Sequence, residues 1–129
     1  MIIINYIIII IIKNGDFLTE DKIKSFNNKE EAEILLEKSR NHIDEIDNEL
    51  MDLISQRTSL AKDFVLAKDF LGIPIYDESR EKAIHKKIRK LSEEKGLDAD
   101  IIDQIIDMLT KLSKIEQNKI LRRNVDGKY

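Results

Sequence analysis

The sequence predicts an all-α fold with three helices in each chain, the first of them very long. The composition favours helices, since 36% of the 129 residues are charged, 42% are hydrophobic, and there are only one Pro and four Gly. Apolar residues recur at spacings of three and four, which places them on one face of a helix. A chain of this length forms one domain with a small core, so we expect it to associate with a second chain.

The first 29 residues are predicted to precede the helical domain. Nine of the twelve residues from Met1 to Ile12 are Ile, a run shorter than the roughly 18 apolar residues of a membrane-spanning helix. No Lys or Arg precedes it, as one would in a typical signal peptide. Three interpretations stay open: an incorrectly assigned start, an added β-prone segment, or a degenerate export signal. Residues 13–29 are polar and form a predicted linker.

The first helix is predicted to run from about Glu30 to Leu71. No Gly or Pro interrupts this segment, which at about 1.5 Å per residue forms a rod of about 60 Å. Its apolar stripe consists of Ile43, Ile46, Leu50, Leu53, Ile54, Leu60, Ala61 and Phe64. A rod of this length needs a partner to cover its stripe.

A second helix follows a tight connection. Gly72 and Pro74 end the first helix, because Gly adopts the left-handed cap conformation and Pro cannot continue a helix. Asp77 is the predicted N-cap of the second helix, which runs from about Glu78 to Lys95. Its inner face carries Ile84, Ile88 and Leu91.

The third helix is predicted from about Ala99 to Arg122, after Gly96 closes the second helix and Asp98 provides an N-cap. Its apolar stripe consists of Ile102, Ile106, Leu109 and Leu112, with Ile105 beside it. The helical domain is therefore predicted to span residues 30–123, and residues 124–129 to form a flexible tail.

The composition argues against several classes of protein. The absence of Cys excludes disulfides, thiolate catalysis and Cys-based metal sites. His42 and His85 have no His or Cys neighbours, so we interpret both as solvated surface residues rather than metal ligands. A net charge of −3 does not favour nucleic acid. We expect a cytoplasmic protein with no metal, no cofactor, no nucleic-acid partner and no membrane partner, the Ile run being the one feature that argues for a membrane.

Polar residues on or beside the apolar stripes are the most informative. Arg57 and Lys68 are eleven residues apart, so they share a helix face and lie about 16 Å from each other. The spacing of the other polar residues likewise places them on common faces: Asp77, Arg80 and Glu81 on the second helix, and Ser113 and Gln117 on the third.

Each of these residues alone has an ordinary explanation. A long side chain can keep its charge in water, an Asp can be a helix cap, and an exposed ion pair contributes only a few tenths of a kcal/mol. Together, however, three helices direct polar groups toward the core, and leaving them unpaired would cost several kcal/mol. The pattern therefore predicts a buried anionic ligand.

The segment from Ser39 to Leu121 resembles the all-helical (type II) chorismate mutases. Five stretches carry the resemblance: RNHIDEID at 40–47, LISQR at 53–57, AKDFVLAK at 61–68, PIYDESRE at 74–81 and SKIEQ at 113–117. The resemblance implies an intertwined homodimeric helical bundle. It also implies an enzyme of Phe and Tyr biosynthesis that rearranges chorismate to prephenate without a cofactor.

Four residues match the family's groups for the carboxylates and the ether oxygen of the substrate. Arg40 and Arg57 match the arginines that hold the two carboxylates, and Lys68 and Gln117 match the pair that donates to the ether oxygen. Arg40 lies about 25 Å from Arg57 and about 42 Å from Lys68 along the same helix. It cannot reach a ligand between those two residues, so we assign Arg40 to the active site of the other subunit.

Four further residues match groups around the substrate ring. Glu81, helped by the Asp77 region, matches the acid that contacts the ring hydroxyl. Arg80 matches an arginine that lines the site, and Ser113 matches a hydroxyl near a carboxylate. All eight positions keep the residue type and the spacing that the family shows.

Two alternative functions remain open. An isochorismate pyruvate-lyase shares this fold and similar chemistry, although Asp77 with Arg80 and Glu81 fits the mutase better. A non-catalytic helical interaction module, such as a sensor or a coiled-coil adaptor, predicts that Arg57, Lys68 and Gln117 are solvated and replaceable.

Overall fold

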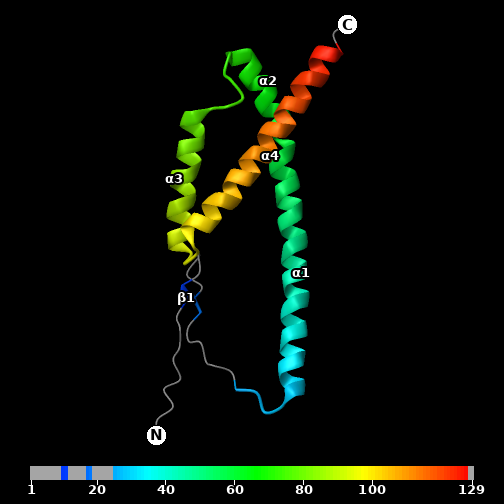
Figure 1. Ribbon diagram of the computed structural model, residues 1–129, viewed down its shortest axis with the longest axis vertical. Helices are drawn as coiled ribbons and strands as arrows, with labels where there is room; N and C mark the ends of the chain where they lie inside the picture. The colour runs from blue at the N-terminus through cyan, green and yellow to red at the C-terminus, as the bar shows by residue number, and fades with distance from the viewer. Residues whose placement is uncertain (1–9, 12–16, 19–24, 128–129) are drawn as a thin grey trace.

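The computed structural model describes residues 10–11, 17–18 and 25–127 and confirms the predicted all-α class, since helices make up nearly all of the described residues (Figure 1). Its helices are α1 (Lys29–Ser59), α2 (Ala61–Leu71), α3 (Glu78–Glu94) and α4 (Ala99–Asp126). Two short antiparallel strands, β1 (Ile10–Ile11) and β2 (Phe17–Leu18), pair Ile10 with Leu18 and Ile11 with Phe17. The rest of the Ile-rich run and most of the predicted linker lie outside the described residues.

The helix predicted as one rod is bent and is described as α1 and α2. Leu60 lies between them with φ −68° and ψ −11°, and its N–H donates to the carbonyl oxygen of Arg57 (3.3 Å) in a tighter turn. The N–H of Phe64 still donates to the carbonyl oxygen of Leu60 (3.1 Å), so the path continues after the bend. Figure 1 shows α2 leaning away from the axis of α1, toward α3.

Two hydroxyl side chains account for the bend. Thr58 Oγ1 donates to the carbonyl oxygen of Ile54 (2.8 Å), and Ser59 Oγ donates to that of Gln56 (2.7 Å). Such bonds compete with the backbone for helix carbonyls and commonly bend a helix. Because neither Gly nor Pro is involved, the usual sequence signals of a break are missing here.

The other helix ends follow from capping groups. The side chains of Asn28, Asp77 and Asp98 accept hydrogen bonds from backbone N–H groups in the first turns of α1, α3 and α4. Gly72 closes α2 with φ 66°, a left-handed conformation that Gly adopts without strain. α4 continues to Asp126, beyond the predicted end at Arg122, because no helix-breaking residue occurs before that point.

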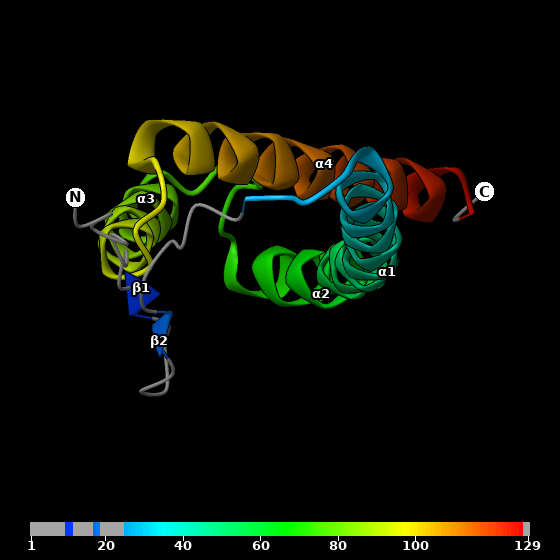
Figure 2. The same cartoon turned by 90° about the horizontal axis from the view of Figure 1, so that it is seen from below.

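α4 is the element that joins the others. It packs against α1, α2 and α3 and lies across one side of them in Figure 2. Among the described residues the buried apolar side chains are Ala61 and Val65, both on α2, and the buried polar ones are Ser92, Ser113 and Gln117. The core of the single chain is therefore small, and polar side chains form much of it. No described helix is long and apolar enough to cross a membrane.

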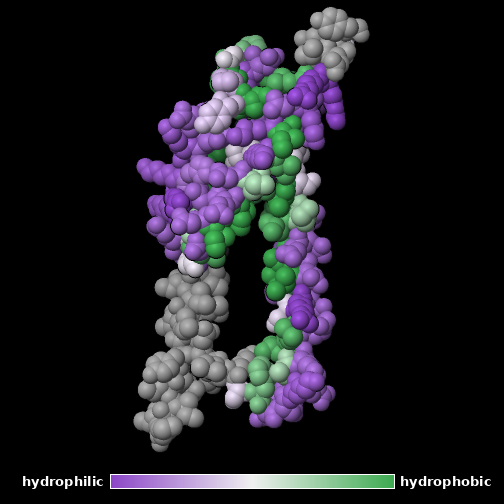
Figure 3. Space-filling view, viewed as in Figure 1, coloured by the Kyte–Doolittle hydropathy of each residue, from purple (hydrophilic) through white to green (hydrophobic). Residues whose placement is uncertain are grey.

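α1 presents an uncovered apolar face. Ile43, Ile46, Leu50 and Leu53 recur at helical spacing and are each about half exposed. Figure 3 shows this hydrophobic stripe on the side of α1 that faces α3, with hydrophilic side chains on the outer side. The single chain thus leaves a large apolar surface in contact with water.

Candidate active site

A cavity of about 410 Å³ lies between the end of α1 and the helices α2, α3 and α4. Seven of the eight predicted site residues line it: Arg57, Lys68, Asp77, Arg80, Glu81, Ser113 and Gln117. They are separated by up to 60 positions in the sequence, so the fold is what brings them together. Apolar side chains complete the wall, namely Leu60, Phe64, Ile73, Ile75 and Ile84. The cavity combines a few polar groups with apolar walls, as small-molecule sites do.

Lys68 and Gln117 are hydrogen-bonded neighbours in the lining of this cavity. Lys68 Nζ donates to the carbonyl oxygen of Ile75 (2.7 Å) and to Gln117 Oε1 (3.3 Å), while Gln117 Nε2 donates to Ser113 Oγ (3.1 Å). Gln117 is 4% exposed and Ser113 is 9% exposed. Because these bonds fix both side chains, an ammonium donor and an amide donor are held side by side before any ligand binds.

Arg57 occupies the last turn of α1, where a cation is favoured by the helix dipole. Its Nη1 donates to the carbonyl oxygen of Leu109 on α4 (3.0 Å), and the side chain is partly buried. A guanidinium has five N–H donors in a planar fork. Arg57 therefore keeps donors that can bind a carboxylate in the cavity.

The first turn of α3 supplies the acidic side of the cavity. Asp77 Oδ1 accepts from the backbone N–H of Arg80 (3.0 Å), so Asp77 is a helix cap as well as a lining residue. Glu81 lies one turn further and pairs with Lys114 of α4, with Nζ and Oε1 2.8 Å apart. Lys114 and Thr110 also line the cavity, and neither was among the residues predicted from the sequence. Their three-residue spacing from Gln117 and Ser113 was the available signal.

Arg40 is the predicted site residue that the single chain does not bring to the cavity. It lies on α1 with a side chain that is 64% exposed, and Nη1 is 3.9 Å from Glu37 Oε2. It is absent from the lining of the cavity. This position agrees with the distance along the helix from which we assigned Arg40 to another subunit, an assignment that stays a prediction.

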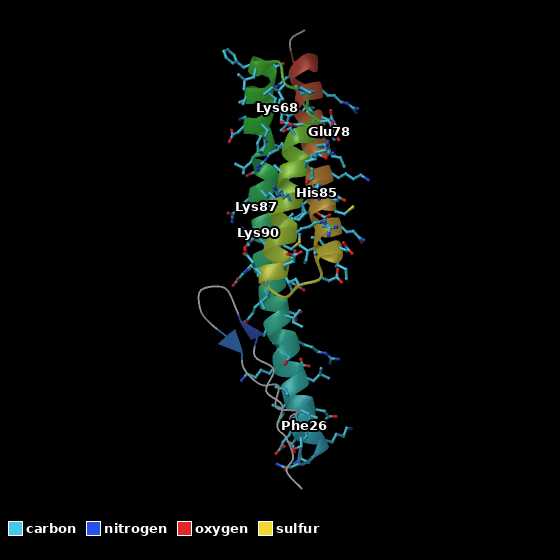
Figure 4. The ribbon with its side chains drawn as sticks, turned by 90° about the vertical axis from the view of Figure 1, so that its left-hand side faces the viewer. Phe26, Lys68, Glu78, His85, Lys87 and Lys90 are labelled. Atoms are coloured by element: carbon cyan, nitrogen blue, oxygen red, sulfur yellow. The ribbon has the colours of Figure 1, made fainter. Side chains whose placement is uncertain are left out.

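His85 corrects the interpretation of both histidines as solvated surface residues. Its side chain is only 30% exposed and lies between two carboxylates of α4: Nδ1 contacts Asp103 Oδ1, and Nε2 is 3.0 Å from Asp107 Oδ1. Figure 4 shows His85 on the α4 side of α3 and Lys87 and Lys90 on the opposite side. The prediction holds for His42, whose side chain is 71% exposed.

The cluster around His85 shifts two pKa values in opposite directions. The hydrogen bond to Asp103 raises the pKa of His85 above its ordinary value of 6.5, with further help from the charges of Asp103, Asp107 and Glu81. The same bond, with the charges of His85 and Arg89, holds the pKa of Asp103 below 3.8. The cluster connects α3 to α4 one turn beyond Glu81, so it helps to hold the wall of the cavity.

We expect the His85 cluster to make stability depend on pH. Since its pKa is raised, His85 contributes fully below pH 6.5, and this contribution is lost as the pH rises through the raised value. The contribution of Asp103 is present above pH 3.8 and is lost as the pH falls through its lowered pKa. His85→Gln should therefore lower the free energy of unfolding more at about pH 5.5 than at about pH 8.5.

Urea unfolding of the wild type and the variant at both pH values measures this difference. His42→Gln is the matched control, because His42 is exposed and has one neighbour on its own helix, Glu45. A destabilisation by His85→Gln that is equal at both pH values would contradict the expected linkage.

The arrangement of the cavity argues against a non-catalytic interaction module. That alternative predicted solvated positions for Arg57, Lys68 and Gln117. Instead all three line one cavity, Gln117 is buried, and both cations are engaged in hydrogen bonds. Buried polar groups that converge on a cavity are typical of a binding or catalytic site.

Known proteins resemble this chain in sequence. A chorismate mutase from Methanocaldococcus jannaschii is 48% identical over 84 residues, which cover 65% of this chain and 80% of the relative. The T-protein of Enterobacter agglomerans is 30% identical over 79 residues, 61% of this chain and 21% of the relative. The similarity to the second protein therefore covers about a fifth of its length.

A solved structure resembles the fold. It is described as the NMR structure of monomeric chorismate mutase from Methanococcus jannaschii, with a TM-score of 0.55 and 39% identity. The match covers 70% of this chain and 95% of the solved chain. Residues 39–118, more than half of the chain, match the family described as chorismate mutase type II. This range contains all eight predicted site residues, and the chain belongs to the type II chorismate mutase family.

Proposed function

We propose that this chain rearranges chorismate to prephenate in the cavity between α1, α2, α3 and α4, as a step of aromatic amino acid biosynthesis. The observation that carries the proposal is the convergence of Arg57, Lys68 and Gln117 on one cavity with apolar walls. Family membership supports the reaction type. The geometry supports a role for each of these side chains.

The charge of the cavity suits a dianion. Four cationic side chains line it (Arg57, Lys68, Arg80 and Lys114), against the two carboxylates of Asp77 and Glu81. The lining therefore has a net charge of +2, which complements the two carboxylates of chorismate. An excess of one charge inside low-dielectric walls raises the local concentration of an oppositely charged ligand.

The reaction itself requires no nucleophile or redox group from the protein. It is an intramolecular pericyclic shift in which one C–O bond breaks while one C–C bond forms, so no atom enters or leaves. What the protein can do is hold the enolpyruvyl arm above the ring in the reactive chair-like shape. Arginines bind carboxylates through two parallel hydrogen bonds, which fix orientation as well as position.

Lys68 and Gln117 are proposed to stabilise the breaking bond. Negative charge develops on the ether oxygen as the C–O bond lengthens, and donors already held in place lower the barrier most effectively. The Lys68 ammonium has three N–H groups, of which two bond Ile75 and Gln117. Gln117 Nε2 has two N–H groups, one of which bonds Ser113. Each side chain thus retains a donor for the substrate.

The proposed active unit is a homodimer of this chain. A second copy that packs along α1 would cover the apolar face of Ile43, Ile46, Leu50 and Leu53. Its Arg40 would supply a further guanidinium to bind a carboxylate of the substrate. The similar solved structure is described as monomeric. The dimer proposal therefore depends on the exposed face of α1 and on the distance of Arg40 from the cavity of its own chain. An isologous pair would contain two equivalent shared sites.

The test of this function is loss of chorismate absorbance with the purified protein, measured across pH. We expect a rate that does not fall as the pH rises from about 5 to about 8, because the amide of Gln117 donates without titrating. Gln117→Glu is the matched variant, since a carboxylate donates only when it is protonated. Its rate should fall as the pH rises over the same range.

Two outcomes would overturn this proposal. One is a wild-type rate that falls steeply between about pH 5 and about pH 8. Such a fall would indicate that the protein group that donates to the ether oxygen must be protonated by a titrating proton. The other is faster release of pyruvate from isochorismate than conversion of chorismate, which would identify the chain as a lyase. Both substrates are therefore assayed with the same preparation.

A further inference from the structure

We propose that Lys114 is a positioning residue that orients Glu81 for the substrate ring and balances its charge. This inference rests on the proposed function and on the match of Glu81 to the family's acid that contacts the ring hydroxyl, so we take Glu81 as the acceptor of a hydrogen bond from that hydroxyl. Lys114 is outside the eight positions that the family resemblance assigned. The structure shows that this lysine of α4 lines the cavity.

The geometry ties Lys114 to Glu81 specifically. Lys114 Nζ donates to Glu81 Oε1 at 2.8 Å, between α4 and α3. The two side chains are 30% and 21% exposed, so water screens this pair less than it screens the ion pairs on the outer faces of the helices. Within the described part of the chain, no hydrogen bond engages Oε2. Lys114 therefore fixes one carboxylate oxygen and leaves the other as an acceptor.

Tyr76 is a second neighbour of the Lys114 ammonium. Lys114 Nζ lies 5.1 Å from the centre of the Tyr76 ring, within the range of a cation–π interaction. Tyr76 belongs to the connection between α2 and α3, and Glu81 to the first turn of α3. The ammonium thus contacts two groups, and this restricts the otherwise flexible lysine chain.

Charge explains why Glu81 needs this partner. Chorismate brings two carboxylates into a cavity that already holds Asp77 and Glu81. An uncompensated Glu81 would repel the ligand, because charges interact strongly in a site with apolar walls. Without Lys114 the net charge of the lining would fall from +2 to +1. Lys114 therefore permits a carboxylate to serve as the hydroxyl acceptor in a site for dianions.

Lys114→Met is the variant that tests this role, because it keeps an unbranched apolar chain and removes the charge. We expect KM for chorismate to rise about tenfold, the effect of losing one charge-assisted hydrogen bond, with little change in kcat. Lys111→Met, an exposed position one turn earlier on α4, is the control and should leave both constants unchanged. Lys114→Arg should restore most of the affinity.

The background variant Glu81→Gln separates this role from a structural one. If Lys114 acts through Glu81, then Lys114→Met should add little to the KM of Glu81→Gln, since Glu81 no longer carries a charge to balance and the lining of the double variant keeps the wild-type net charge of +2. A wild-type KM for Lys114→Met would overturn the proposal, and so would a tenfold rise that persists unchanged in the Glu81→Gln background. A lower kcat at unchanged KM would do the same, because it indicates partial unfolding. Wild-type kinetics of Glu81→Gln itself would overturn the assignment of Glu81 under the proposed function as well.

Discussion

Lys68→Ala is expected to lower kcat for chorismate by about 100- to 1,000-fold, the effect of removing one preorganised donor to a developing oxyanion. The substitution takes away the cationic group that hydrogen-bonds Gln117. KM should change less than kcat, since the charge on the ether oxygen is larger in the transition state than in the bound substrate. Initial rates over a range of chorismate concentrations measure both constants.

The control for Lys68→Ala must account for the second bond that Lys68 makes. Its ammonium also donates to the carbonyl oxygen of Ile75 in the connection before α3, so the variant could loosen that connection. Lys62→Ala removes an exposed lysine of the same helix and should keep wild-type rates. Thermal unfolding of both variants shows whether the fold is retained. A well-folded Lys68→Ala protein with more than about a tenth of the wild-type kcat would contradict the proposed mechanism.

Much of the fold was predictable because local chemistry determines it. The N-caps Asp77 and Asp98 and the C-cap Gly72 act through groups within a few residues, so the sequence shows where α2, α3 and α4 begin or end. The same holds for the apolar stripe of α1. The bend at Leu60 was not predictable in this way, because it depends on hydroxyl bonds that a straight helix could also contain.

Helical spacing and the family resemblance predicted part of the candidate site. Those two sources identified Arg57, Lys68 and Gln117, which do line one cavity. They did not identify the role of Lys114 or of His85, whose partners Glu81 and Asp103 are 33 and 18 residues away. Helical spacing places Lys114 three residues from Gln117, but in a chain that is 36% charged spacing alone does not distinguish such a residue from one in solvent.

Neither helical spacing nor the family resemblance places Arg40 at the cavity of its own chain. The second large effect that we expect is therefore the recovery of activity in mixed dimers. Arg40→Ala and Lys68→Ala are each expected to be inactive alone and to regain activity when they form mixed dimers. In a mixed dimer, one site would combine the intact Lys68 of the first chain with the intact Arg40 of the second, while the other site would lose both. Random mixing in equal amounts makes half of the dimers mixed, so about one quarter of the wild-type activity should return.

Mixing Arg57→Ala with Lys68→Ala provides the matched control. Both residues line the cavity of a single chain, so every site in that mixture keeps one defect and no activity should return. The comparison distinguishes a shared site from a general gain in stability on mixing, since both mixtures pair one cationic substitution with another. If the Arg40→Ala mixture stays inactive after subunit exchange has been demonstrated, then Arg40 does not act across an interface. The exposed face of α1 would then need another occupant, because a long stripe of half-exposed Ile and Leu is typical of an interaction surface.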